Sequence, residues 1–225
     1  RFNKTNIIMA KKQKVEQQED LLQIEMSLID KYKKPFIIGC VALLVIVAAV
    51  SGWQYFSAKS NLEAQEQLFP AQNYFKNGQY ELALNGDSLG AKGFVEMAKG
   101  STKAANLANL YAGLSYAKLA KWDDAVKYLE AYDVQDDNTV SVQALRALGN
   151  CYANQGNVDK AVSTLQKAAK QADGDALAPA CLLEAGALLE TQGKKAEARA
   201  IYESIKKDFP AQSGAIEKYL LRVAE

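Results

Sequence analysis

The chain has 225 residues, with 27 Lys and Arg against 26 Asp and Glu, and its sequence contains no histidine. A net charge of +1 provides no strong field for nucleic acid. Without histidine there is no histidine general base and no histidine metal site, so we expect a protein without enzyme activity, cofactor or small-molecule substrate. Cys151 and Cys181 lie among apolar neighbours and are expected to be buried thiols, with a disulfide as the alternative.

A highly charged tail occupies residues 1–35. Met9, followed by alanine and two lysines, is typical of a natural bacterial start, so we expect residues 1–8 to lie upstream of the natural N-terminus. Apolar residues recur along the tail at Leu21, Leu22, Ile24, Leu28 and Ile29. They favour a cytoplasmic helix lying on the membrane surface, and the alternative is a docking helix for a partner protein.

The next segment, residues 36–56, carries no charged side chain. As a helix it is about 31 Å long, which matches a hydrocarbon core of about 30 Å. Pro35 precedes it, and because proline fits the first turn of a helix we expect the helix to begin there. Trp53 and Tyr55 place interfacial rings at its C-terminal end. The sequence predicts one transmembrane signal anchor; a buried core helix and a cleaved signal peptide are the alternatives.

Lysines flank this segment unequally. Lys31, Lys33 and Lys34 precede it closely, whereas Lys59 is the nearest lysine that follows. Because positive charge is retained on the cytoplasmic side, we expect the N-terminus in the cytoplasm and residues 57–225 on the far side. The expected location is a bacterial inner (cytoplasmic) membrane, with the lipid bilayer as one partner and the C-terminal domain in the periplasm.

Residues 57–105 are expected to form a helical linker and a degenerate first repeat, because the segment 74–84 keeps a turn glycine before a short apolar helix. Pro70 is expected to kink the helix before it, since proline removes a backbone donor. Several glycines between residues 85 and 103 predict an irregular loop with a short helix near 94–99.

Between residues 106 and 210, one pattern of small residues occurs three times. Gly113, Gly149 and Gly186 recur at intervals of 36 and 37 residues, and an alanine follows each by twelve positions, at Ala125, Ala161 and Ala198. Small side chains at these positions let two helices approach closely. The pattern resembles the tetratricopeptide repeat, a helix–turn–helix unit of about 34 residues. The longer period predicts extended loops at 133–139 and 171–175.

The turn inside each repeat is expected seven residues after the glycine, at Gly156, Gly193 and, in the first copy, Ala120. After the last copy, apolar residues with helical spacing predict a capping helix: Ile216, Tyr219, Leu220 and Val223. The predicted fold class is therefore all-α. A single transmembrane helix is followed by a tetratricopeptide-type helical-hairpin solenoid, with three repeats and a C-terminal capping helix over residues 106–225.

Stacked helix pairs curve into a superhelix whose concave face is lined mainly by the first helix of each pair. The repeat alignment places twelve residues there: Leu107, Leu110, Leu114 and Lys118, then Gln143, Arg146, Asn150 and Asn154, then Ala180, Leu183, Ala187 and Glu190. Eight of them are candidate protein-binding residues: Leu107, Leu110, Leu114, Lys118, Arg146, Asn150, Asn154 and Leu183. The alternative for each is ordinary packing or a solvated surface.

The order of charged tail, single span and short repeat domain, with strings such as Tyr74–Leu84 and Leu114–Leu129, is similar to the ancillary Sec-translocon subunit (YfgM-like) family. The resemblance covers most of the chain from about Lys31 onward. It implies an inner-membrane protein beside the export channel. Its implied partners are Sec translocon subunits and a periplasmic chaperone or exported clients. A scaffold for envelope assembly or division complexes is the alternative function.

Overall fold

The computed structural model describes the backbone of residues 2–172 and 176–224; up to Phe36 it describes the side chains of Met26, Lys33 and Lys34 alone. Every regular element in these ranges is a helix, accompanied by one isolated bridge between Gly86 and Lys92. This confirms the predicted all-α class. The chain forms two compact units, Arg1–Ala58 and Lys59–Glu225.

The first helix, α1 (Phe2–Lys76), begins in one unit and ends in the other. Its stretch from Ile37 onward is long and apolar enough to cross a membrane, and none of the most apolar part of that stretch is buried. The alternative of a buried core helix is therefore wrong. An exposed apolar helix surface of this length is typical of a membrane-spanning segment.

Both prolines of the N-terminal region lie inside α1, which corrects our expectation of a helix start at Pro35. The helix is also continuous through Pro70. A proline removes one backbone hydrogen bond, and a long helix retains the bonds of its other turns. Beside Pro70, Leu68 and Ala71 are buried in a cluster with α4 residues, and this packing offsets the missing bond.

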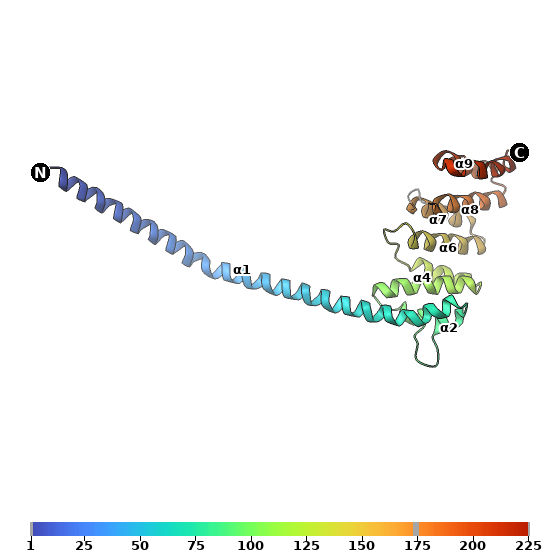
Figure 1. Cartoon of the computed structure of the whole chain (residues 1–225), viewed down its shortest axis with the longest axis horizontal. Coiled ribbons are helices and arrows are strands. Elements are labelled where there is room, and N and C mark those ends of the chain that lie inside the picture. The colour runs from blue at the N-terminus through green and yellow to red at the C-terminus, as the bar shows by residue number, and fades with distance from the viewer. Residues whose placement is uncertain (1, 173–175, 225) are drawn as a thin grey trace. The chain divides into compact units, whose positions relative to one another are not determined.

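Three helical hairpins carry the predicted repeats in the second unit, and Figure 1 shows their first helices α4, α6 and α8 in successive layers. The pairs are α4 (Lys103–Lys118) with α5 (Trp122–Glu130), α6 (Val140–Asn154) with α7 (Val158–Gln171), and α8 (Leu177–Thr191) with α9 (Lys195–Asp208). The short helices α2 (Tyr80–Asn85) and α3 (Phe94–Met97) precede them, and η1 (Pro210–Gln212) and α10 (Ser213–Arg222) follow. The short helix expected near 94–99 and the capping helix are thus confirmed.

The glycine of each repeat lies where the two helices of a hairpin touch. A Cβ atom added to Gly113 would lie 2.5 Å from Leu129 Cγ, and one added to Gly149 would lie 2.8 Å from Leu165 Cγ. Ordinary carbon contacts are about 3.5–4.0 Å long. The expectation that these glycines permit close helix approach is confirmed.

The tight turns also follow the repeat. Gly156 and Gly193 have φ angles of 79° and 70°, and Ala120 takes the same left-handed conformation with φ 54°. This conformation costs little for glycine but about 1–2 kcal/mol for a residue with a Cβ atom. The first hairpin therefore contains a strained turn that the other two avoid.

The loop between α5 and α6 is held by the Asp137 carboxylate. It accepts hydrogen bonds from the backbone N–H groups of Thr139 and Ser141, each at 3.0 Å, and from the Ser141 hydroxyl at 2.6 Å. Gln171 of α7 donates to the backbone carbonyl of Asp137 at 3.1 Å. The predicted loop at 133–139 is thus confirmed, and these hydrogen bonds hold it in place. The last three residues of the predicted loop at 171–175 lie outside the described residues.

Candidate protein-binding surface

The first helices α4, α6 and α8 present a mixed surface, which we call the first-helix face. Lys118, Asn150 and Asn154 are exposed there. Four apolar or charged candidates are half-buried: Leu107, Leu114, Arg146 and Leu183. The face combines two cations and two amide groups with the exposed parts of leucines, a composition that suits contact with a polypeptide.

Leu110 was expected on this face, and that expectation is wrong. Its side chain is only 5% exposed and belongs to a core cluster with Ala144 and Leu148 of α6. Three residues along a helix correspond to 300°, so Leu110 is rotated by about 60° from Leu107. The rotation turns Leu110 into the contact between α4 and α6, where it stabilises the stack of repeats.

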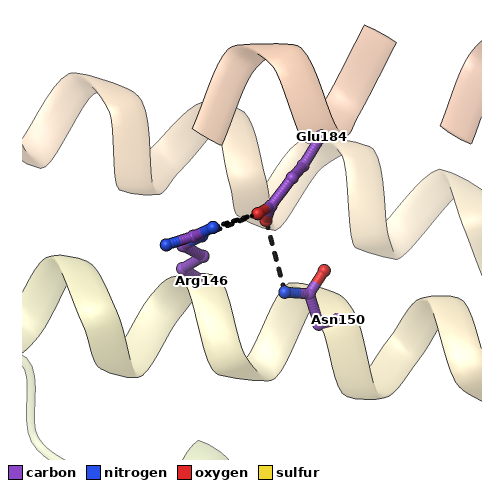
Figure 2. Close-up of polar contacts among 3 residues, drawn as sticks. All are labelled: Arg146, Asn150 and Glu184. Atoms are coloured by element: carbon purple, nitrogen blue, oxygen red, sulfur yellow. Dashed lines mark hydrogen bonds and ion pairs between the residues drawn. The ribbon is translucent and has the colours of Figure 1, made fainter. Parts of the chain in front are cut away.

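The centre of the face is a polar cluster that joins two repeats (Figure 2). Arg146 Nε donates to Glu184 Oε1 at 2.9 Å, and a second guanidinium nitrogen donates to the same oxygen. Asn150 Nδ2 donates to Glu184 Oε2 at 3.2 Å. Arg146 and Asn150 come from α6 and Glu184 from α8, so the second and third repeats are linked across their first helices.

The cluster is accessible as well as paired. The Arg146 and Glu184 side chains are 32% and 29% exposed. The hydrogen bond to Glu184 raises the pKa of Arg146 above its ordinary value, so the guanidinium remains charged at any physiological pH. In the chain by itself, the strongest donors of the first-helix face are therefore occupied by an internal carboxylate.

A second cluster joins the last repeat to the capping helix. Arg222 of α10 donates to Glu190 Oε1 of α8 at 2.8 Å, and the buried Tyr202 hydroxyl of α9 donates to the same carboxylate. Burial raises the pKa of Glu190, but the hydrogen bonds from Arg222 and Tyr202 outweigh burial and hold that pKa below its ordinary value. Glu190 therefore stays ionised and ties α10 to the repeat before it.

A hollow of about 610 Å³ adjoins Leu107. It lies between the N-terminal half of α4 and the α5–α6 loop, beside Asn106 and Asp133. Asn106 Nδ2 donates to the Asp133 carbonyl at 2.9 Å, and Asp133 N–H donates back at 2.7 Å. This pair fixes one wall of the hollow, so the surface near Leu107 is preformed.

Sequence reasoning named Arg146 and Asn150 but missed Glu184, their partner. The repeat period carried a signal for it: Glu184 lies 38 residues after Arg146, close to one period of 37. A charge of opposite sign one period later on a first helix lies beside the earlier one in the stack. Asn154, also predicted, donates to the backbone carbonyl of Asn150 at 2.8 Å and faces solvent.

The two cysteines of the repeats are buried free thiols, at 1% and 0% exposure. Burial raises the pKa of the Cys151 thiol to about 11 and raises that of Cys181 as well. Neither supplies a reactive thiolate, which requires a lowered pKa. Within the part of the chain that the structure describes, no group of three or more metal-ligating Cys, Asp or Glu side chains occurs.

A family model described as a tetratricopeptide repeat-like domain matches residues 28–223. The matched region contains the apolar stretch of α1 as well as every helical hairpin. No curated protein matches the chain. The match thus treats the apolar stretch and the repeats as parts of one pattern.

Proposed function

The chain belongs to the tetratricopeptide repeat-like domain family, and on this basis we propose that it is a membrane-anchored module that binds other proteins through its first-helix face. Stacked helix pairs offer an extended surface rather than an enclosed site, which suits a polypeptide ligand. The observation that carries the proposal is the row of solvent-accessible polar and apolar groups along α4, α6 and α8, represented by Lys118, Asn150 and Leu183.

The anchor in this proposal is the apolar stretch of α1 from Ile37. Its exposed aliphatic side chains and the three lysines before it support a single pass with the N-terminus in the cytoplasm. The repeats then lie in the periplasm of a bacterial inner membrane. Protease added to spheroplasts is expected to digest the repeats. Protection of the repeats in intact spheroplasts would contradict this orientation.

The partners in this proposal are Sec translocon subunits, with exported clients or a periplasmic chaperone held beside the channel. Support comes from the resemblance to the ancillary translocon subunits and from the combination of anchor and repeats. Co-purification from native membranes is expected to recover translocon subunits in amounts comparable to the chain. Recovery of division or outer-membrane assembly proteins in their place would favour a scaffold for envelope assembly.

A matched pair of charge reversals tests the binding surface. Lys118 ends α4 on the first-helix face, whereas Lys167 lies on α7, a second helix, and both are exposed. Lys118→Glu is expected to weaken partner capture at least tenfold, because it reverses the charge that a partner meets, while Lys167→Glu leaves capture unchanged. Equal effects of the two substitutions would show that net charge, and not this face, governs binding.

Glu184 also sets what the face accepts. A partner carboxylate has to displace Glu184 before it reaches the donors of Arg146 and Asn150. We therefore expect an acidic segment to bind weakly at Arg146 and Asn150 of the unmodified chain. Glu184→Ala should raise the affinity for a peptide rich in aspartate, measured by fluorescence anisotropy, and should leave a lysine-rich peptide no better bound. An unchanged affinity for the acidic peptide would exclude competition by Glu184.

A further inference from the structure

A tightly ordered hairpin at the N-terminal end of the repeat unit displays one apolar side chain to solvent. The hairpin, residues 86–93, lies between α2 and α3 and is closed by the bridge from Gly86 to Lys92. Leu89 lies at its tip and is 92% exposed, the highest value among the large apolar side chains that the structure describes. A leucine exposed to this degree gains no stability from the fold and costs solubility.

The hairpin is held rigidly, so the position of Leu89 is fixed in advance. The Asp87 carboxylate accepts hydrogen bonds from the backbone N–H groups of Leu89 and Ala91, each at 2.9 Å. It also accepts one from the Tyr74 hydroxyl of α1 at 2.5 Å. A Cβ atom on Gly93 would lie 2.1 Å from the Leu84 carbonyl oxygen, so the base of the hairpin is closely packed. Such preorganisation lowers the entropic cost of binding through the tip.

A hollow lies directly beside this projecting leucine. Its volume is about 480 Å³, and it is lined from the hairpin by Gly90, Ala91 and Lys92 and from α1 by Glu63, Glu66, Gln67 and Pro70. Two further apolar side chains of α1, Leu62 and Phe69, are each rotated by about 100° around the helix from the lining residue next to them, so they lie outside the hollow. Leu62 and Phe69 are 59% and 61% exposed, and their spacing of seven places them on one side of the helix.

A projection and a hollow on the same surface are the two elements of a self-complementary interface. In a dimer with twofold symmetry, the same patch of both copies meets, so each projection enters the hollow of the other copy. We propose that the chain forms such a dimer, with Leu89 of each copy seated in the hollow between α1 and the hairpin of the other.

The charges at the rim of the hollow fit a second copy of the chain. Glu63 and Glu66 lie on the α1 side and Lys92 on the hairpin side. A twofold axis that exchanges the two hairpins brings Lys92 of one copy toward the carboxylates of the other. A bilayer surface is a less favourable partner for this patch, since its anionic headgroups would be repelled by the two glutamates. The proposal does not depend on the function proposed for the first-helix face.

Photo-crosslinking of the full chain in detergent tests the dimer. Benzoylphenylalanine replaces Leu89, and equal amounts of ¹⁵N-labelled and unlabelled chain are mixed before irradiation. We expect a product of twice the chain mass that joins the tryptic peptide 77–92 of one isotope to the peptide 60–76 of the other. Benzoylphenylalanine at Leu221, which is 71% exposed on α10, is the control and should give no such product. Crosslinks between peptides of one isotope alone would overturn the proposal.

Substitution of the same residue tests the energetics. Leu89→Asp is expected to weaken dimerisation at least tenfold by sedimentation equilibrium, because a carboxylate would enter a hollow rimmed by Glu63 and Glu66, whereas Leu89→Met should retain it. Both variants should keep the wild-type circular dichroism, since the Leu89 side chain is exposed. A monomeric wild-type chain, or a dimer that Leu89→Asp leaves unchanged, would overturn the proposal. In native membranes, crosslinks from position 89 only to other proteins or to lipid would do so too.

Discussion

Replacing Gly186 by alanine is expected to destabilise the third repeat. The new Cβ atom would lie 2.4 Å from Tyr202 Cε1 and 2.7 Å from Cζ. To restore a contact of about 3.5 Å the ring must move by about 1 Å. Tyr202 is fully buried and its hydroxyl donates a hydrogen bond to Glu190, so movement of the ring disturbs both the packing and this hydrogen bond.

Two opposing terms set the size of the effect. Alanine stabilises a helix interior over glycine by about 0.8–1.0 kcal/mol, whereas overpacking a core costs about 1–3 kcal/mol. Because Tyr202 cannot move freely, we place the cost in the upper part of that range. The expected net loss is about 1–2 kcal/mol, or a fall in Tm of about 2–8 °C for a unit of this size.

Thermal unfolding followed by near-ultraviolet circular dichroism measures this loss. Gly214→Ala in α10 is the control, because its Cβ would meet nothing within 4 Å, and it should be neutral or slightly stabilising. In a Tyr202→Ala background the clash is absent, so Gly186→Ala should become stabilising by up to about 1 kcal/mol. If Gly186→Ala is as stable as wild type in the unmodified background, close helix approach does not explain the repeated glycine.

Three further predictions concern individual residues. Ala120→Gly should stabilise the chain by about 0.5 kcal/mol in urea unfolding. The reason is that relief of about 1–2 kcal/mol of left-handed strain exceeds the free-energy cost of the extra entropy that glycine gives the unfolded state. A loss of stability would show that the Ala120 turn is not strained. Cys151 should react with a thiol reagent at pH 8 about 100-fold more slowly in the folded chain than after unfolding, since burial raises its pKa to about 11; equal rates would contradict its burial. Burial raises the pKa of Asp137, but hydrogen bonds from Ser141 outweigh burial and hold this pKa below its ordinary value. The ionised carboxylate therefore stabilises the fold fully above about pH 4, and its contribution to stability is lost as the pH falls further. Wild type and Asp137→Asn should therefore differ in Tm at pH 7 and converge below pH 4; a constant difference would exclude that role.

The features that sequence predicted correctly are those set by short-range sterics within the repeat. Gly156 and Gly193 take positive φ angles because a two-helix turn needs them, and Ala120 was recognised because the period places it there. The contacts of Gly113 and Gly149 follow from the same rule of close helix approach. A periodic sequence specifies such positions because each copy repeats the same helix–turn–helix geometry, so a residue required at a position recurs once in every copy.

Two of the three misses concern interactions between copies, which the period constrains less. Leu110 was placed on the surface because residue spacing alone does not show whether a side chain rotated by about 60° from Leu107 is exposed or packs against α6. Glu184 was overlooked because its role depends on which rotamers reach Arg146 across two helices. Pro35 was taken as a helix start because local preference favours that position, yet helix on both sides of it makes it internal. In each case packing or continuity over many residues outweighs the local signal.

The first-helix face and the interface at Leu89 involve different elements, so partner binding and self-association should be separable. The face uses α4, α6 and α8, whereas the dimer uses α1 and residues 86–93, and the two surfaces share no residue. Lys118→Glu should therefore reduce partner capture without changing the dimer, and Leu89→Asp should weaken the dimer at least tenfold without lowering the capture of partner per chain. If Leu89→Asp lowers capture as much as Lys118→Glu does, the partner is held by two copies together, and a binding surface confined to one repeat stack is wrong.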